Sequence, residues 1–129
     1  MRPQPLDEKL ANRLRAAGAV HATLFGSVAR GTERFDSDID VAVSFGKAMS
    51  SKRKMTVMAL IADISGRSVD LIDLEKAEGL ILAQALGGRE ILCDSVATRT
   101  RMAMRLIRFE DDRMSVARAM RSVRTGLFT

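Results

Sequence analysis

Two aspartates, Asp38 and Asp40, alternate with apolar residues in a stretch whose pattern is typical of a β-strand. Side chains two positions apart on a strand point to the same face, so this spacing brings two carboxylates side by side. Like charges at such short range repel each other unless a cation neutralises them. Carboxylate oxygens suit a hard divalent cation, and Mg²⁺ is usually bound by one or two carboxylates together with substrate phosphates. The pair therefore predicts a magnesium site.

A turn of small residues precedes the aspartate pair. Gly26 and Ser27 follow a short apolar stretch and are separated from Asp38 by ten residues. Glycine allows the backbone to approach a ligand closely, and N–H groups after a strand, together with the serine hydroxyl, can bind phosphate oxygens. Strand, phosphate-binding turn and metal-binding carboxylates together predict a nucleoside triphosphate site.

A third acid at such a site could accept the proton of an attacking hydroxyl. Asp70 and Asp73 are the two candidates, because both lie on a later stretch with the pattern of a strand. Asp70 lies nearer the start of that strand, as Asp38 and Asp40 do on theirs, and we favour it over Asp73.

Short strands and helices alternate through the first 94 residues. Continuous or two-periodic apolar stretches indicate the strands, whereas apolar residues three and four apart, followed by glycine, indicate the helices. This pattern predicts helices at 5–18, 50–66 and 77–88 and strands at 19–25, 38–45, 68–75 and 89–93. On strand 38–45 the larger apolar residues share one face, and Asp38, Asp40, Ala42 and Ser44 share the other.

The chain changes character after Asp94. An apolar stripe at helical spacing runs through the remaining residues and consists of Met102, Leu106, Phe109, Val116, Met120 and Val123. This segment also holds eight arginines and three acids, a balance of +5 that equals the net charge of the whole chain. The pattern predicts an amphipathic helical tail, which the acidic run at 110–112 could split in two. The stripe is either internal core or a surface for a partner, and the arginines are either a solvated face or part of that surface.

Composition limits the class of protein. The chain has 129 residues, a net charge of +5 and a pI of about 10.1, which predicts a small basic protein. The excess of positive charge fits either anionic partners or plain solubility. No apolar stretch approaches the roughly 20 residues that span a bilayer, and one cysteine excludes an intrachain disulfide, so we expect a cytoplasmic protein without a membrane contact. We expect no nucleic-acid partner, because no recognition motif accompanies the charge and phenylalanine is the only aromatic residue type.

Two residues that could bind a metal receive structural interpretations. His21 lies in an apolar predicted strand and lacks histidine or cysteine companions, so it cannot build a metal site of its own. Cys93 ends the stretch "REILC" and is interpreted as a small core residue.

The stretch from Leu24 to Asp94 resembles the minimal nucleotidyltransferase (MNT) family of the DNA polymerase β superfamily. The resemblance rests on "GS" followed after ten residues by "DID", on "ARG" at 29–31 within that gap, and on Ser37 before the first aspartate. The stretch "SGRSVDLIDL" at 65–74 resembles the strand that carries the family's third acid, and Asp70 occupies that position. By size and layout, the chain is most similar to the MntA-type antitoxins that are paired with HEPN toxins.

This resemblance implies a fold and a site. The implied fold class is α+β, a small mixed β-sheet flanked by helices, with a nucleotidyltransferase domain at 1–94 and a basic helical tail at 95–129 packed on or continuing it. The implied catalytic residues, which are also ligands for two Mg²⁺ ions, are Asp38, Asp40 and Asp70. The implied nucleotide-binding residues are Gly26, Ser27, Arg30 and Ser37. Arg30 could equally be a solvated loop residue.

The resemblance also implies an activity, the transfer of AMP from ATP to a hydroxyl of a partner HEPN toxin, which neutralises the toxin. The implied acceptor is a tyrosine. Two alternatives stay open. The chain could be a non-catalytic antitoxin that acts by binding alone, or a minimal nucleotidyltransferase that modifies a small-molecule acceptor.

Overall fold

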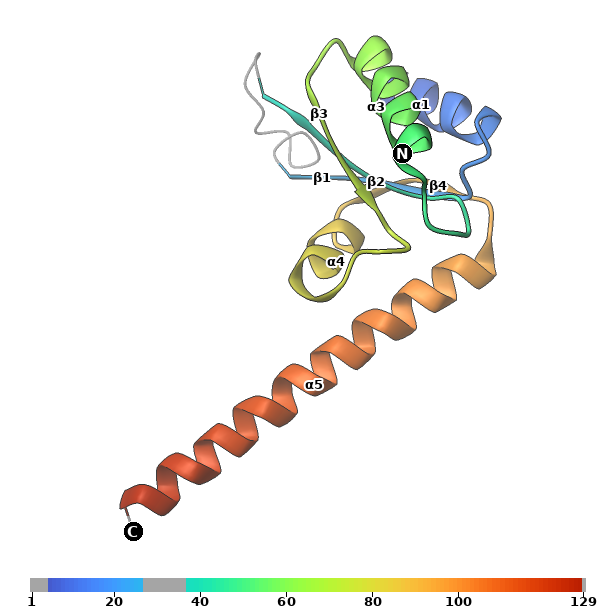
Figure 1. Ribbon diagram of the computed structural model, residues 1–129. Helices are drawn as coiled ribbons and strands as arrows, with labels where there is room; N and C mark the ends of the chain where they lie inside the picture. Colours follow the sequence, from blue (N-terminus) through green and yellow to red (C-terminus); the bar gives the residue numbers. More distant parts are fainter. Residues whose placement is uncertain (1–4, 27–36, 129) are drawn as a thin grey trace.

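A mixed four-stranded sheet forms the centre of the fold (Figure 1). The computed structural model describes residues 5–26 and 37–128, without the side chains of 116 and 122–128. The strands lie in the order β3 (Val69–Asp73), β2 (Ile39–Ser44), β1 (His21–Phe25) and β4 (Arg89–Cys93). Strand β1 pairs antiparallel with both β2 and β4, whereas β2 and β3 run parallel. The predicted α+β fold with a mixed sheet is therefore confirmed.

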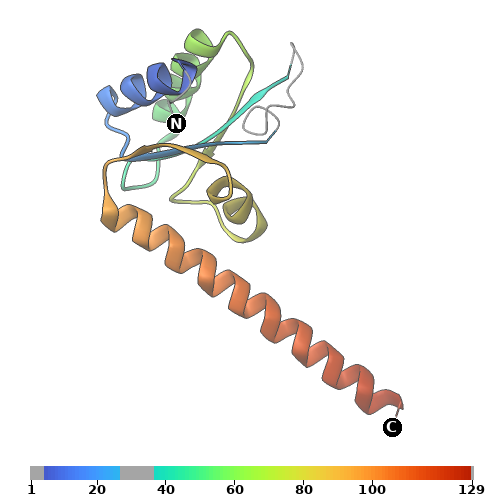
Figure 2. The same cartoon turned by 180° about the vertical axis from the view of Figure 1, so that it is seen from behind.

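Two helices, α1 (Pro5–Ala16) and α3 (Ser51–Ser65), cover one face of the sheet (Figures 1 and 2). Helix α3 begins where the Ser50 hydroxyl accepts a hydrogen bond from the Arg53 amide, and it ends at Gly66 in the left-handed conformation. The apolar sides of both helices and of the sheet form the larger core, which includes Leu10, Leu14, Ile39, Val41, Val43, Val57 and Ile61.

The other face is covered by α4 (Gly79–Leu86) and by the first turns of α5 (Val96–Phe128). A second core forms there, with Phe25, Ala42, Leu82, Ala85 and Met102 among its buried members. Because both faces of the sheet are covered, strand β2 is buried on both sides, and Ala42 and Ser44 lie in the interior although they share a face with Asp40.

The first turns of α5 are fastened to the connection between β3 and α4. Arg101 donates two hydrogen bonds to the Glu75 carboxylate, at 2.8 and 2.9 Å, and these bonds are the main reason that the pKa of Glu75 is lowered. Arg105 donates to the carbonyl oxygens of Leu74 and Ala77. Charge-assisted hydrogen bonds of this kind fix the direction in which the helix leaves the domain.

Helix α5 is a single uninterrupted helix, so the predicted split near 110–112 is wrong. The acidic run lies on exposed turns, where water solvates the charges, and Glu110 also pairs with Arg113 at 2.7 Å. Solvated charges of this kind do not break a helix that contains no proline.

Most of α5 extends away from the rest of the protein (Figures 1 and 2). Of the predicted apolar stripe, Met102 is buried and Leu106 and Phe109 are half-buried, whereas Met120 is 64% exposed. The described side chains at 111–115 and 117–121 are all exposed. The stripe is thus core only in the first turns. Among the helices that the structure describes, none combines the length and the apolar character needed to cross a bilayer.

Candidate active site

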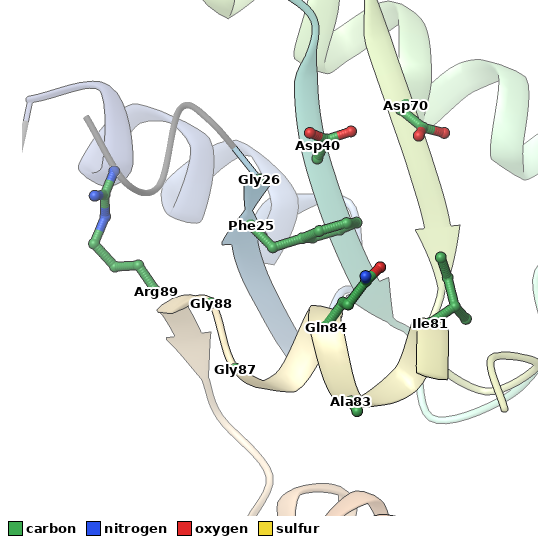
Figure 3. A pocket seen from close by; sticks show the side chains of 10 residues that line it. All are labelled: Phe25, Gly26, Asp40, Asp70, Ile81, Ala83, Gln84, Gly87, Gly88 and Arg89. Atoms are coloured by element: carbon green, nitrogen blue, oxygen red, sulfur yellow. The ribbon is translucent and has the colours of Figure 1, made fainter. Parts of the chain in front are cut away.

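Asp40 and Asp70 lie directly opposite each other on the parallel strands β2 and β3. Both line a pocket of about 620 Å³ on the side of the sheet that carries α4 (Figure 3). The rest of the lining comes from the end of β1, from α4 and from the turn into β4: Phe25, Gly26, Ile81, Ala83, Gln84, Gly87, Gly88 and Arg89. Residues distant in sequence thus bring two carboxylates into one solvent-accessible pocket.

Two glycines allow the walls of this pocket to come close together. Gly26 has a φ of 74°, and a Cβ added there would collide with Oδ2 of Asp40. A Cβ on Gly88 would likewise collide with the carbonyl oxygen of Leu24, at the end of β1. Glycine is therefore required at Gly26 both by backbone conformation and by the closeness of the carboxylate.

None of the other described residues of the predicted site lines this pocket. Asp38 is exposed, comes one residue before β2 and is not among the residues that line the pocket. The Ser37 carbonyl accepts a hydrogen bond from Nη1 of Arg67 at 3.0 Å. Ser27 and Arg30 lie outside the described residues. The structure therefore brings together Gly26, Asp40 and Asp70.

Asp73 has a different environment from Asp70. It is buried, and its carboxylate accepts hydrogen bonds from the backbone amides of Met49 at 2.7 Å and Glu75 at 2.9 Å. Residues three apart on a strand face opposite sides, so Asp73 points away from the face that carries Asp40. Its oxygens hold the loop before α3 and the turn after β3, which is a structural role.

The sequence did not indicate that α4 and the turn after it form one wall of the pocket. Gln84 is the only polar side chain in α4. A single polar residue in an otherwise apolar helix is the signal that could have indicated that this helix lines a pocket. Gly87 and Gly88 were interpreted only as a helix stop. Arg89 donates two hydrogen bonds to Asp7, at 2.8 and 3.2 Å, and so ties the edge of the pocket to α1.

The donor set suits a hard cation with a phosphate ligand. Two carboxylates on neighbouring strands supply anionic oxygens, and neither sulfur nor imidazole is among the described lining residues. Oxygen-only sites of this kind select Mg²⁺ or a similar cation over softer metals. Apolar side chains of Phe25 and Ile81, with the amide of Gln84, form a second part of the pocket that can bind an aromatic base and a sugar.

The parallel neighbouring strands β2 and β3 each carry one aspartate, and Gly26 lies beside the aspartate of β2. This arrangement is that of a nucleotidyltransferase. The family model described as polymerase beta, nucleotidyltransferase, matches residues 8–97, which is more than half of the chain. The chain belongs to that family. No curated protein matches the sequence.

Within the family, the fold is that of the MNT chains found in toxin–antitoxin complexes. A chain in a crystal structure of a toxin–antitoxin with AMP-PNP is 21% identical with a TM-score of 0.74, over 92% of this chain and 98% of that one. A chain from a structure of a tri-AMPylated Shewanella oneidensis HEPN toxin in complex with MNT antitoxin is 19% identical with a TM-score of 0.67, over 93% and 96%. A chain of the toxin–antitoxin MntA–HepT is 17% identical with a TM-score of 0.65, over 98% and 100%.

Proposed function

We propose that this protein is an antitoxin that transfers AMP from ATP to a tyrosine hydroxyl of a HEPN toxin. The observation that carries the proposal is the pairing of Asp40 with Asp70 in a pocket large enough for a nucleotide. Family membership supports nucleotidyl transfer. The shared fold with chains from complexes that contain AMP-PNP or an AMPylated HEPN toxin supports ATP as the donor and a toxin as the acceptor.

The carboxylates fit a Mg²⁺ site. Asp40 and Asp70 would hold the ion. Asp38 lies two residues before Asp40 in the sequence, and its carboxylate would be the third acidic ligand. When bound, Mg²⁺ supplies charge neutralisation for the triphosphate and for the charge that develops on the transferred group. Gly26, Ser27, Arg30 and Ser37 would bind the phosphates.

The chain's own contribution to the chemistry is positioning and one proton transfer. The acceptor oxygen forms a bond to the α-phosphorus of ATP, and the bond from that phosphorus to the departing pyrophosphate breaks. Asp70 takes the proton that the hydroxyl loses. Asp70 is suited to this role because it is exposed to the pocket, whereas the buried Asp73 is already engaged by two backbone amides.

The acceptor must come from another molecule if it is a tyrosine. The chain contains no tyrosine, so tyrosine-directed transfer cannot be self-modification. The exposed part of α5 offers a surface for the partner, with the apolar side chains of Met114 and Met120 among arginines. Methionine and arginine are enriched at protein interfaces, which supports a role of this segment in holding the toxin.

Intact-mass spectrometry tests the proposal. The protein alone with Mg²⁺ and ATP should gain no mass, whereas a cognate HEPN toxin added to it should gain one or more AMP units. Asp70→Asn should suppress the gain because the acceptor hydroxyl loses its proton acceptor. A toxin that is neutralised without any gain of mass would instead favour an antitoxin that acts by binding alone. AMP transfer to a small molecule with an unmodified toxin would favour the third alternative.

A further inference from the structure

A second cluster of metal-binding side chains lies at the opposite end of β1 from Gly26. It consists of His21 on β1 and of Glu90 and Cys93 on β4. One ligand atom from each residue lies within 4.8 Å of the other two. An imidazole nitrogen, a carboxylate oxygen and a thiol sulfur at this spacing can share a single ion.

A β-bulge brings these three side chains to one face. His21 is the register partner of Cys93, and Thr23 is the partner of Glu90, so the register shifts between Ala22 and Thr23. Without the shift, residues three apart on β4 would point to opposite faces. In the folded chain His21 therefore has Glu90 and Cys93 beside it, and the interpretation that it lacks metal-binding neighbours is wrong. Cys93, expected in the core, is only half-buried.

The imidazole of His21 has an unused nitrogen. Its side chain is 2% exposed, and its Nδ1 atom is buried and has no hydrogen-bond partner among the described residues. Buried polar atoms are nearly always paired, because an unpaired one loses its bonds to water without compensation. A neutral imidazole binds a metal through either ring nitrogen, so Nδ1, which has no partner among the described residues, leaves His21 able to bind an ion.

There is room for an ion and for a further ligand beside the cluster. A pocket of about 180 Å³ lies between His21, Glu90 and the first turns of α5, where Arg99 and Met102 contribute to its wall. Glu90 faces two groups there, with Oε2 at 3.7 Å from Nε2 of His21 and at 3.5 Å from Nε of Arg99. The Arg99 side chain is 64% exposed, so it can turn into solvent when a cation takes its place.

We propose that His21, Glu90 and Cys93 form a Zn²⁺ site. Zinc is the divalent ion that accepts nitrogen, oxygen and sulfur ligands together at four-coordinate sites, whereas Mg²⁺ takes oxygen ligands alone. Three protein ligands leave the fourth position for water, on the side of the pocket. Since His21 lies on β1 and Glu90 and Cys93 lie on β4, the bound ion would hold these two strands together. This site is separate from the Asp40 and Asp70 pocket and does not depend on the proposed transfer activity.

Cobalt substitution tests this proposal in the full chain. Co²⁺ bound to a thiolate gives a sulfur-to-metal charge-transfer absorption, and the chain has a single cysteine, so such a band can only report Cys93. We expect one Co²⁺ or Zn²⁺ per monomer, the charge-transfer band, and a higher melting temperature with Zn²⁺. Cys93→Ser should abolish the band, and Glu90→Gln, at an exposed position, should weaken Zn²⁺ binding at least tenfold.

A control variant separates this site from the catalytic carboxylates. Asp40→Asn with Asp70→Asn should leave the band and the Zn²⁺ affinity unchanged. His21→Gln tests the third ligand, and circular dichroism establishes whether that variant and the others fold. The proposal is overturned if Zn²⁺ fails to bind, if the double aspartate variant removes the binding, or if folded Glu90→Gln and His21→Gln proteins bind Zn²⁺ as tightly as the wild type. One ion per two chains would place Cys93 in a bridge between copies and would also overturn it.

Discussion

The backbone of Gly26 lies so close to the carboxylate of Asp40 that only a hydrogen atom fits between them. Gly26→Ala should therefore lower both stability and activity. The left-handed backbone alone costs about 1–2 kcal/mol with a side chain. The added methyl group also displaces the Asp40 carboxylate from its place beside Asp70. Urea unfolding and the AMP-transfer assay measure the two effects.

Gly46→Ala is the matched control for this change. Gly46 has a φ of 81°, and a Cβ added there would meet nothing within 4 Å. The control should thus lose a similar amount of stability and keep its transfer activity. Equal activity in both variants would show that the contact between Gly26 and Asp40 does not matter for the site.

Asp70→Asn and Asp73→Asn should have opposite consequences. Asp70→Asn removes one of two neighbouring negative charges, so the melting temperature should hold or rise while AMP transfer is lost. Asp73→Asn weakens the hydrogen bonds to the Met49 and Glu75 amides and should cost about 1–3 kcal/mol, with activity retained in the folded fraction. Thermal unfolding and transfer assays on both variants decide between them. Loss of activity in Asp73→Asn alone would make Asp73 the third acid.

Magnesium should stabilise the wild type with ATP more than it stabilises variants of the acidic pair. A ligand that binds only the folded state raises the melting temperature by an amount that grows with the logarithm of its concentration divided by its Kd. Asp38→Asn and Asp40→Asn should each reduce the increment that Mg²⁺ adds in the presence of ATP. Differential scanning fluorimetry with Mg²⁺ and ATP varied separately gives this increment. An unchanged increment in Asp40→Asn would contradict its place as a metal ligand.

The attachment of α5 should weaken in acid. The hydrogen bonds from Arg101 hold the pKa of Glu75 below its ordinary value of 4.5, so the folded state binds fewer protons than the unfolded state. This contribution to stability is present above pH 4.5 and is lost as the pH falls through the folded-state pKa. The melting temperature of the wild type should thus fall more steeply below pH 5 than that of Glu75→Gln. If the melting temperatures of the two proteins fall equally with pH, the pairing of Glu75 with Arg101 adds nothing to stability.

Deletion of 115–129 should leave the domain folded and able to bind ATP but weaken its binding to the partner. The described side chains from 117 to 121 are exposed, so their removal takes little apolar area out of the core. Calorimetric titration with ATP and with the cognate toxin compares the two affinities. If the shortened chain unfolds or loses ATP binding, α5 belongs to the core rather than to an interface.

The approximate positions of the secondary-structure elements were predictable from the sequence. The strand predicted around Asp40 is present as β2, and the glycine stop of α3 is confirmed at Gly66. The family was predictable as well, because the spacing from Gly26 to Asp40 is a local property of the chain. Such features depend on residues close in sequence, whose geometry is set by the backbone of one strand or turn.

Pairing between distant strands decided the rest. Periodicity puts Asp70 and Asp73 on opposite faces of β3, but only the parallel register with β2 places Asp70 beside Asp40. Similarly, the bulge between β1 and β4 places Cys93 and Glu90 beside His21, which no sequence spacing could indicate. The apolar stripe of α5 looks continuous along the chain, yet the small domain covers only its first turns, because the helix leaves the sheet at the angle that Arg101 and Arg105 hold.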